Sequence, residues 1–347
     1  MTRHTIGLFT FIAASMMTLA CTQKEPCFKM RGVVLAIEDL ETVEWPKLAH
    51  ENGINTIGAH FSLTGFLKSD KGKKFMSDCE KYGITVENQL HAMSMLLPRE
   101  LFAEDSSLFR MDQRGRRVND CNLCVHSPKA LDIVAENALN YARLLPSASH
   151  RYYFWIDDGQ PMCACPACAE YSDSEQALIV ENRIIKALRT FDPEAQLAHL
   201  AYENTRPAPQ RVKPAEGIFL EFAPIERSWD KAISDEHATG TRFETPHKIL
   251  LQDLKDNLTV FPVETAVVLE YWLDVSLFSS WKKPAVKLPW NRSVFESDID
   301  TYARLGIRNI TSFAVYMDDK YMEAYGSDVR QFLKEYGNGL KNRTLER

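Results

Sequence analysis

The chain has 347 residues, of which 45% are hydrophobic, enough to bury the core of one large domain or of two modest ones. Its 41 basic and 47 acidic residues give a net charge of −6, and no basic run could follow a phosphate backbone, which excludes nucleic acid as an expected partner. No internal repeat, low-complexity segment or Ser/Pro-rich linker divides the sequence, so we predict a single domain.

The first twenty residues have the pattern of an export signal. Arg3 is followed by the mostly apolar run TIGLFTFIAASMMTLA, which is too short and too early for a working membrane span. The small residue Ala20 directly before Cys21 fits the cleavage site of a lipoprotein. We predict a signal peptide over residues 1–20, a lipid anchor on Cys21 with a tether over 21–29, and an outer-membrane or periplasmic location. A secreted protein without the lipid is the alternative.

Short β-branched or apolar runs then alternate with longer amphipathic ones, which predicts alternating strands and helices. We expect strands at 31–37, 54–61, 84–93, 151–159, 195–202, 217–224, 266–274 and 307–316. The intervening helices are expected at 42–53, 71–83, 127–145, 174–191, 247–258, 296–306 and 327–341. Gly53 and Gly83 can end two of these helices in the left-handed conformation, and Ser172 with Glu175 makes a capping box.

Eight strands with intervening helices indicate a (β/α)8 TIM barrel, which needs about 250 residues plus insertions. We therefore predict one α/β barrel over residues 30–340. The alternative, an open doubly wound sheet, calls for a glycine-rich phosphate turn after an early strand, and the sequence has none.

Polar residues stand where the predicted strands end, which is where such a barrel carries its active site. They are His60, His91, Asp157, Asp158, Tyr202, Glu203, Glu221, the run from Glu270 to Asp274, Tyr316, Asp318 and Asp319. Trp155, Trp229 and Trp272 lie on or beside the same rim. Carboxylates, histidines and aromatic faces in one bowl suit a sugar, whose hydroxyls form hydrogen bonds while its C–H face stacks on rings.

Cleavage of a glycoside needs two carboxyl groups across the scissile bond. Asp158 and Glu270 would face each other across the barrel mouth, because their strands are three apart in a ring of eight. We predict Asp158 as the acid and Glu270 as the nucleophile or base, with no cofactor for catalysis. A second option pairs Asp157 with Asp158, one of them orienting an acetamido group, but it requires the strand to end before Asp158, since neighbouring strand residues point to opposite faces.

The remaining rim residues are expected to contact a carbohydrate substrate. They are His91, His60, Trp155, Tyr202, Glu203, Trp272 and Tyr316. A purely structural role is the alternative for the two histidines. A barrel that binds a glycan without cleaving it is the alternative for the whole protein.

Cysteines cluster after two neighbouring strands. Cys121 and Cys124 follow the third strand, and Cys163, Cys165 and Cys168 follow the fourth. Because neighbouring βα loops touch, these sulfurs can meet at one corner of the rim. Thiolates at such spacing suit a structural zinc ion, whereas an oxidising compartment favours disulfides. For Cys124, Cys163, Cys165 and Cys168 both interpretations stay open. A metal-handling surface protein without a pocket is a third functional class.

Two segments resemble a known family. ENQLHAMSMLLPRELFAEDSSLFRMDQRGRRVNDCNLCVHSP, residues 87–128, and the block beginning DDGQPMCACPAC are similar to the domain of unknown function 4838 family of exported bacterial proteins, over roughly residues 85–225. The resemblance implies a barrel akin to those of α-glucuronidases and β-hexosaminidases, encoded among polysaccharide-utilisation genes. The matching positions are His91, Cys124, Asp158, Cys163, Cys165, Cys168, Asn182 and Tyr202, whereas His126 departs from the pattern.

Overall fold

A closed barrel of eight parallel strands forms the centre of the protein. The computed structural model describes residues 26–61, 63–146, 149–240 and 243–344, so the predicted signal peptide and Cys21 lie outside the described residues. Each strand pairs with the next one in the sequence, and β8 pairs with β1 to close the ring. The strands are β1 (Met30–Ala36), β2 (Thr56–His60), β3 (Thr85–His91), β4 (Arg151–Trp155), β5 (Gln196–Ala201), β6 (Ile218–Phe222), β7 (Val267–Glu270) and β8 (Asn309–Phe313). The predicted single-domain (β/α)8 barrel is confirmed.

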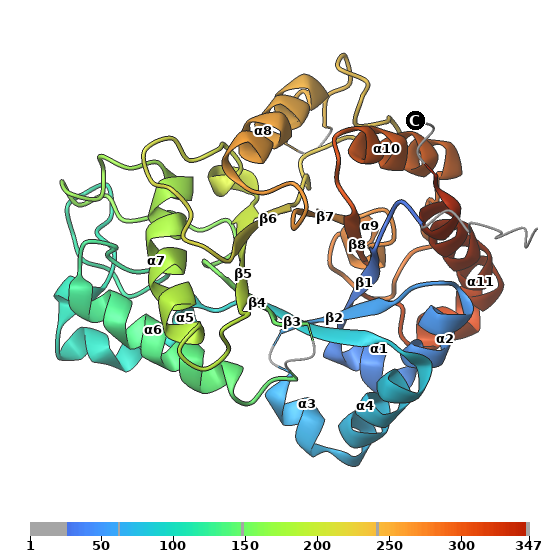
Figure 1. Ribbon diagram of the computed structural model, residues 1–347, viewed down its shortest axis with the longest axis horizontal. Helices are drawn as coiled ribbons and strands as arrows, with labels where there is room; N and C mark the ends of the chain where they lie inside the picture. Colours follow the sequence, from blue (N-terminus) through green and yellow to red (C-terminus); the bar gives the residue numbers. More distant parts are fainter. Residues whose placement is uncertain (1–25, 62, 147–148, 241–242, 345–347) are drawn as a thin grey trace, which may run out of the picture.

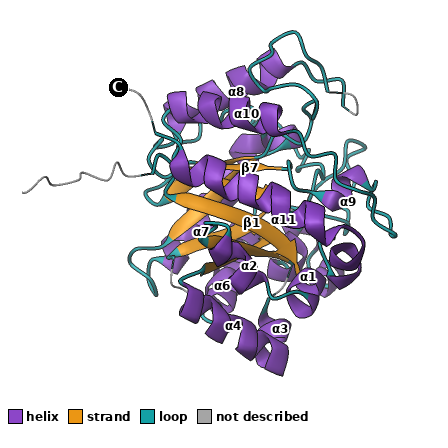
Figure 2. Ribbon diagram, turned by 90° about the vertical axis from the view of Figure 1, so that its right-hand side faces the viewer, coloured by secondary structure: helices purple, strands orange, loops and turns teal. Residues whose placement is uncertain are grey.

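Helices surround the barrel, as Figure 1 shows. Figure 2 shows the strands enclosed between α8 and α10 on one side and α4 and α6 on the other. The α-helices are α1 (Ile37–Thr42), α2 (Trp45–Glu51), α3 (Thr64–Lys68), α4 (Asp70–Tyr82), α5 (Met93–Leu96), α6 (Pro128–Ala142), α7 (Asp173–Leu188), α8 (His247–Val260), α9 (Val275–Phe278), α10 (Arg292–Arg304) and α11 (Asp319–Asn342). Short 3₁₀ turns are η1 (Arg99–Ala103), η2 (Ser106–Leu108) and η3 (Glu203–Thr205). Among the described helices, none combines the length and apolarity needed to cross a bilayer.

The strands are buried on both faces, and side chains alternate between two apolar layers. In β4, Tyr153 and Trp155 pack inside the barrel, while Tyr152 and Phe154 pack outward against the helices. This double burial explains why the strands appear in the sequence as nearly continuous apolar runs. The same alternation decides which side chain of each strand can reach the barrel mouth.

The predicted helix signals act as expected. Gly83 ends α4 in the left-handed conformation with φ of 65°, and its N–H reaches the last carbonyls of that helix. The Ser172 hydroxyl accepts a hydrogen bond from the Glu175 N–H, and the Glu175 carboxylate accepts one from the Ser172 N–H. This capping box fixes the start of α7, directly after the cysteine-rich loop.

The chain enters the barrel at the amino ends of the strands. The Cys27 N–H donates to the Arg343 carbonyl at 2.9 Å, and the Lys29 N–H donates to the Arg308 carbonyl at 2.7 Å. The side chain of Phe28 is fully buried between these contacts. Packed structure therefore includes the last residues of the predicted tether, on the face opposite the carboxyl ends of the strands.

Candidate active site

A pocket of about 700 Å³ opens at the carboxyl ends of the strands, where the sequence places the site. Of the predicted catalytic and substrate-binding residues, those that line it are His60, His91, Trp155, Asp158, Tyr202, Glu203 and Tyr316. The structure adds Phe61, Trp281 and Phe313, which sequence reasoning did not select, and from the run between Glu270 and Asp274 it brings in Tyr271 and Asp274. Polar and aromatic groups thus share one concave surface.

Packed rings line the inner part of the pocket. The ring of His91 lies 5.1 Å from that of Trp155, and the ring of His60 lies 5.3 Å from that of Phe313. Trp155 is buried, and its indole N–H donates to the Glu221 carboxylate inside the barrel at 2.9 Å. Burial, with a smaller contribution from the charge of His91, lowers the pKa of His60 to about 3. His60 is therefore a neutral wall of the pocket at physiological pH.

Asp158 lies just past β4 and is paired with His91. The Nδ1 of His91 lies 2.6 Å from the Ile156 carbonyl, and because a carbonyl only accepts, Nδ1 must carry the proton. The other nitrogen, Nε2, lies 3.7 Å from Oδ1 of Asp158, whose side chain is 65% exposed. His91 is thus held by the Ile156 carbonyl with Nε2 facing Asp158 at the open surface of the pocket.

A tyrosine lies between Asp158 and a second carboxylate, Glu203. Burial first, and then the negative charges of Asp158 and Glu203, raise the pKa of Tyr202 well above its ordinary value. The phenol consequently stays protonated and can donate to either carboxylate. Tyr202 and Glu203 directly follow β5, the neighbour of β4, so adjacent strands deliver the three groups.

Gly159 makes room for Glu203 beside Asp158. Its φ is 58°, a conformation that favours glycine, and a Cβ at this position would lie 2.3 Å from Oε2 of Glu203. A glycine next to Asp158 therefore allows the two carboxyl groups to share one wall.

We expect Gly159→Ala to displace the Glu203 carboxylate from this wall. The matched control is Gly115→Ala, because Gly115 has a similar φ of 75° but nothing within 4 Å of the added methyl group. Both variants should lose about 1–2 kcal/mol of folding stability from the left-handed backbone. Urea denaturation checks this shared loss, and crystal structures of both variants check the displacement. An unmoved Glu203 in Gly159→Ala would contradict the packing argument.

Four non-glycine residues of the pocket wall have left-handed backbones. Their φ angles are 74° at Phe61, 45° at Glu203, 54° at Trp281 and 75° at Tyr316. Each costs of order 1–3 kcal/mol, which the surrounding structure must supply, and such outliers cluster at functional sites. Phe61 and Trp281 are also large apolar side chains that remain 60% and 45% exposed. The rim thus holds aromatic rings toward solvent at an energetic cost.

Asp274 is a third carboxyl group in the pocket, and sequence reasoning did not single it out from the run that begins at Glu270. It is the N-cap of α9, where its Oδ1 accepts from the backbone N–H of Ser276 at 3.0 Å and from the Ser276 hydroxyl at 2.6 Å. Burial raises its pKa to about 6, although the contacts with Ser276 oppose this shift. Asp274 can therefore change protonation state in the range where acid and base catalysts work.

Glu270, the predicted nucleophile or base, faces away from the pocket. Leu269 points into the barrel, so the next side chain along β7 points outward to the helices. There Glu270 is fully buried, accepting a hydrogen bond from Arg227 at 2.6 Å and another from the Tyr302 hydroxyl. The prediction that Glu270 lies opposite Asp158 in the pocket is wrong, and its role is structural.

Trp272, which was predicted to bind substrate, also points outward to the helices and not into the pocket. Its indole N–H donates to Asp298 of α10 at 2.9 Å, and its ring packs edge-to-face on Phe295 at 5.1 Å. Only 6% of the residue is exposed. Trp272 therefore belongs to the apolar layer between barrel and helices and not to the pocket.

Two further residues that the sequence brought forward are structural. Asp157 accepts from the Asn122 N–H at 2.7 Å and lies 3.5 Å from the guanidinium of Arg99, behind the pocket wall. The option in which Asp157 and Asp158 act together on one substrate is not supported, because only Asp158 lines the pocket. Asn182, on α7, accepts from the Ala215 N–H at 2.6 Å and holds a loop instead.

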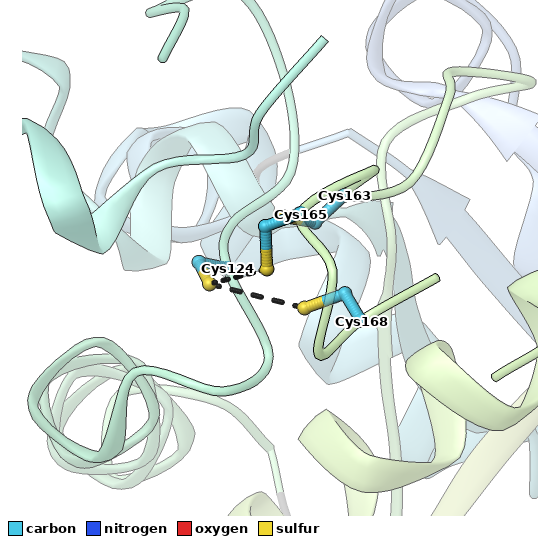
Figure 3. A group of neighbouring side chains, drawn as sticks. All are labelled: Cys124, Cys163, Cys165 and Cys168. Carbon is cyan, nitrogen blue, oxygen red and sulfur yellow. Dashed lines mark hydrogen bonds between the residues drawn. The ribbon is translucent and has the colours of Figure 1, made fainter. Parts of the chain in front are cut away.

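Four cysteines meet beside the pocket. Cys124 comes from the loop after β3, and Cys163, Cys165 and Cys168 come from the loop after β4, as Figure 3 shows. Their sulfur atoms all lie within 4.8 Å of one another, so the cluster could bind a metal ion. All four are buried free thiols. The structure therefore brings the predicted set of four sulfurs together.

Known proteins are similar to this chain mainly in fold. The family model described as Domain of unknown function (DUF4838) matches residues 22–333. Among solved structures, a glycoside hydrolase family 20 β-N-acetylglucosaminidase matches at 11% identity and a TM-score of 0.54, covering 92% of this chain and 70% of that one. A xylose isomerase domain protein from Planctomyces limnophilus matches at 12% identity and a TM-score of 0.42, covering 91% and 99%. No curated protein matches the sequence.

Proposed function

The chain belongs to the DUF4838 family, and on this premise we propose that it is a glycoside-hydrolase-like enzyme that acts on complex glycans or their oligosaccharides. One observation carries the proposal: the carboxyl groups of Asp158, Glu203 and Asp274 line a single pocket together with aromatic rings. Export as a lipoprotein anchored through Cys21 is part of the proposal and rests on the sequence pattern.

The pocket has the chemistry that a sugar requires. Exposed rings at Phe61 and Trp281 offer faces on which the C–H side of a pyranose can stack, and the carboxylates and Tyr202 offer hydrogen bonds to its hydroxyls. About 700 Å³ is within the range of small-molecule sites. A β-N-acetylglucosaminidase with the same barrel fold adds support from a protein that handles sugars.

Asp158 is assigned as the proton donor to the glycosidic oxygen. It is open to the pocket, as a group that protonates a bound glycoside must be. His91 keeps its own orientation through the Ile156 carbonyl and presents Nε2 to the side chain of Asp158. Tyr202 adds a hydrogen-bond donor that stabilises the carboxylate left behind.

Asp274 takes the role of base or nucleophile that the sequence assigned to Glu270. Asp274 follows the end of β7, which is three strands from β4 in the ring. Its carboxyl group therefore lines the pocket across the mouth from Asp158, where a base or nucleophile is needed. With its pKa raised to about 6 by burial, Asp274 is mostly ionised at pH 7 and still basic enough to accept a proton. This acid and base chemistry needs no metal ion.

A panel of aryl glycosides and oligosaccharides tests the proposal with purified protein. We expect turnover on at least one member. The control variant Asp70→Asn should turn over the same compounds as the wild type, because the Asp70 side chain is fully exposed on α4. Calorimetric binding of the same compounds runs in parallel. Binding without cleavage would favour the glycan-binding alternative, and neither binding nor cleavage would overturn the assignment of the pocket to carbohydrates.

Asp274→Asn is expected to lower kcat by about 10²–10⁴-fold while keeping the helix cap, because an asparagine oxygen can still accept from Ser276. In the wild type, activity should rise as the pH increases through about 6, since a base must be ionised to act. The pH profile of kcat in both proteins is the measurement. An unchanged acid limb in Asp274→Asn would remove this residue from the mechanism.

A further inference from the structure

We propose that Cys124, Cys163, Cys165 and Cys168 bind one zinc ion as four thiolates, and that this ion fixes the loops that position Asp158. The metal site rests only on the sulfur cluster, whereas its effect on Asp158 rests on the proposed function. Binding would release the four thiol protons to solvent and leave a complex with a charge of −2. No electron is transferred.

The sulfur spacing matches a tetrahedral zinc centre. The Sγ of Cys124 lies 3.8 Å from that of Cys165 and 3.8 Å from that of Cys168. Four sulfurs at about 2.3 Å from one ion lie about 3.8 Å apart along each edge of the tetrahedron. A disulfide would instead need about 2.05 Å between two sulfurs. Figure 3 shows the sulfurs of Cys165 and Cys168 directed toward that of Cys124.

Hydrogen-bond donors surround the sulfurs and would offset their charge. The backbone N–H of Met111 donates to Sγ of Cys163 at 3.3 Å, and the guanidinium of Arg117 lies 3.8 Å from the same sulfur. Nδ1 of His126 lies 3.5 Å from Sγ of Cys168. A buried anionic centre needs such partners. His126, which departs from the family pattern, therefore has a place next to one of the four ligands.

The loop that carries three of the sulfurs is held in place from α7. The side-chain carbonyl of Gln176 accepts from the Cys163 N–H at 3.1 Å, while its amide group donates to the carbonyls of Cys163 and Cys168, both at 3.2 Å. Gln176 is itself buried. The sulfurs thus converge on a scaffold that the rest of the fold maintains, which limits the entropy lost on binding an ion.

A short relay connects the cluster to Asp158. Asn122, two residues before Cys124, donates its backbone N–H to Asp157 at 2.7 Å, and its side-chain carbonyl accepts from the Asp157 N–H at 2.9 Å. Its side-chain amide donates to the Pro161 carbonyl at 3.1 Å. Asp157 precedes Asp158 directly, so an ion that fixes Cys124 against the loop after β4 also fixes the backbone that presents Asp158.

Metal content and thiol state of the wild type test the site without reference to activity. We expect one zinc per chain by elemental analysis, four thiols that become reactive only after chelation, and the absorption of a tetrahedral thiolate complex when Co²⁺ replaces zinc. Two disulfides by mass spectrometry, with no bound metal after expression in the presence of zinc and export, would overturn the site.

Cys168→Ser and Cys121→Ser form a matched pair of variants. Both cysteines are buried near the cluster, but Cys121 directs its sulfur to the Pro161 carbonyl at 3.7 Å and is not one of the four ligands. We expect Cys168→Ser to weaken zinc binding at least about 10–100-fold and Cys121→Ser to keep full occupancy. Equal metal content in the two variants would contradict the assignment. If Cys168→Ser does not fold, chelation of the wild type provides the metal-free state.

The effect on Asp158 is read by hydrogen exchange and by kinetics. Removing zinc should increase amide exchange over residues 155–160 and lower kcat, while re-addition of zinc restores both. Faster exchange with no glycosidase activity in any state would overturn only the proposed function. Unchanged exchange and unchanged kcat in the metal-free protein would overturn the positioning role and leave the metal site standing.

Discussion

Asp158→Asn is expected to lower kcat by about 10²–10⁴-fold, because an amide in this position cannot donate a proton to the leaving group as a carboxyl group does. The substitution keeps the size of the side chain, so folding and substrate affinity should change little. Steady-state kinetics on a substrate found with the glycoside panel give kcat, and calorimetry gives the affinity.

Glu170→Gln is the matched control for this variant. Glu170 is an exposed carboxylate on the same loop after β4, and it does not line the pocket. It should keep the kcat of the wild type. Activity of Asp158→Asn within a factor of two of Glu170→Gln would exclude Asp158 as the proton donor.

Arg227→Met is expected to destabilise the protein by about 3–5 kcal/mol. Arg227 is fully buried and lies 2.6 Å from a carboxylate oxygen of Glu270 and 2.7 Å from one of Asp298, which are also fully buried. Removing the cation leaves two buried carboxyl groups with no neutralising partner. Urea denaturation followed by tryptophan fluorescence gives the change in the free energy of unfolding.

The pH dependence separates this electrostatic loss from a simple loss of packing. Burial raises the pKa of Glu270 to about 7 even though Arg227 opposes the shift, so its protonated form is favoured in the folded state. Arg227→Met removes the charge that lowers this pKa, so stability should be retained at pH values below Glu270's ordinary pKa and lost progressively as the pH rises above it. The control, Arg292→Met, removes an exposed partner of Glu296 and should cost under about 1 kcal/mol. A pH-independent loss in Arg227→Met would refute the electrostatic explanation.

Hydrophobic periodicity was enough to predict the barrel, because the barrel fold depends on the order of strands and helices and not on where each one ends. All eight strands lie within or overlap their predicted ranges. The prediction overran the carboxyl ends, however: β4 ends at Trp155, not at residue 159, and β7 ends at Glu270, not at residue 274. Directly past these ends apolar residues continue, Ile156 after β4 and Tyr271 to Leu273 after β7, so periodicity alone does not mark the boundary.

The same double burial explains which site residues were found and which were not. His60, His91, Asp158 and Tyr202 lie at or past strand ends, and their side chains face the mouth. Glu270 is the last residue of β7, and the other residues of this strand are apolar on both faces, so the sequence does not reveal that Glu270 points outward. Choosing Asp274 instead would have required the exact end of β7.

The cysteine cluster was predictable because it needs only loop adjacency. C-x-C-x-x-C after the fourth strand and a cysteine after the third must meet if β3 and β4 are neighbours, and they are. Sequence spacing did not separate Cys124 from Cys121; in the structure Cys124 faces the cluster, whereas Cys121 directs its sulfur to the Pro161 carbonyl.

The entry of the chain at the amino ends of the strands determines how the protein would be presented to a bulky substrate. Cys27 and Phe28 pack beside Arg343, on the face opposite the pocket. The described chain thus begins on the face opposite the pocket. With the proposed lipid on Cys21, the mouth would point away from the bilayer, so a polysaccharide too large to pass between protein and membrane could still reach Asp158.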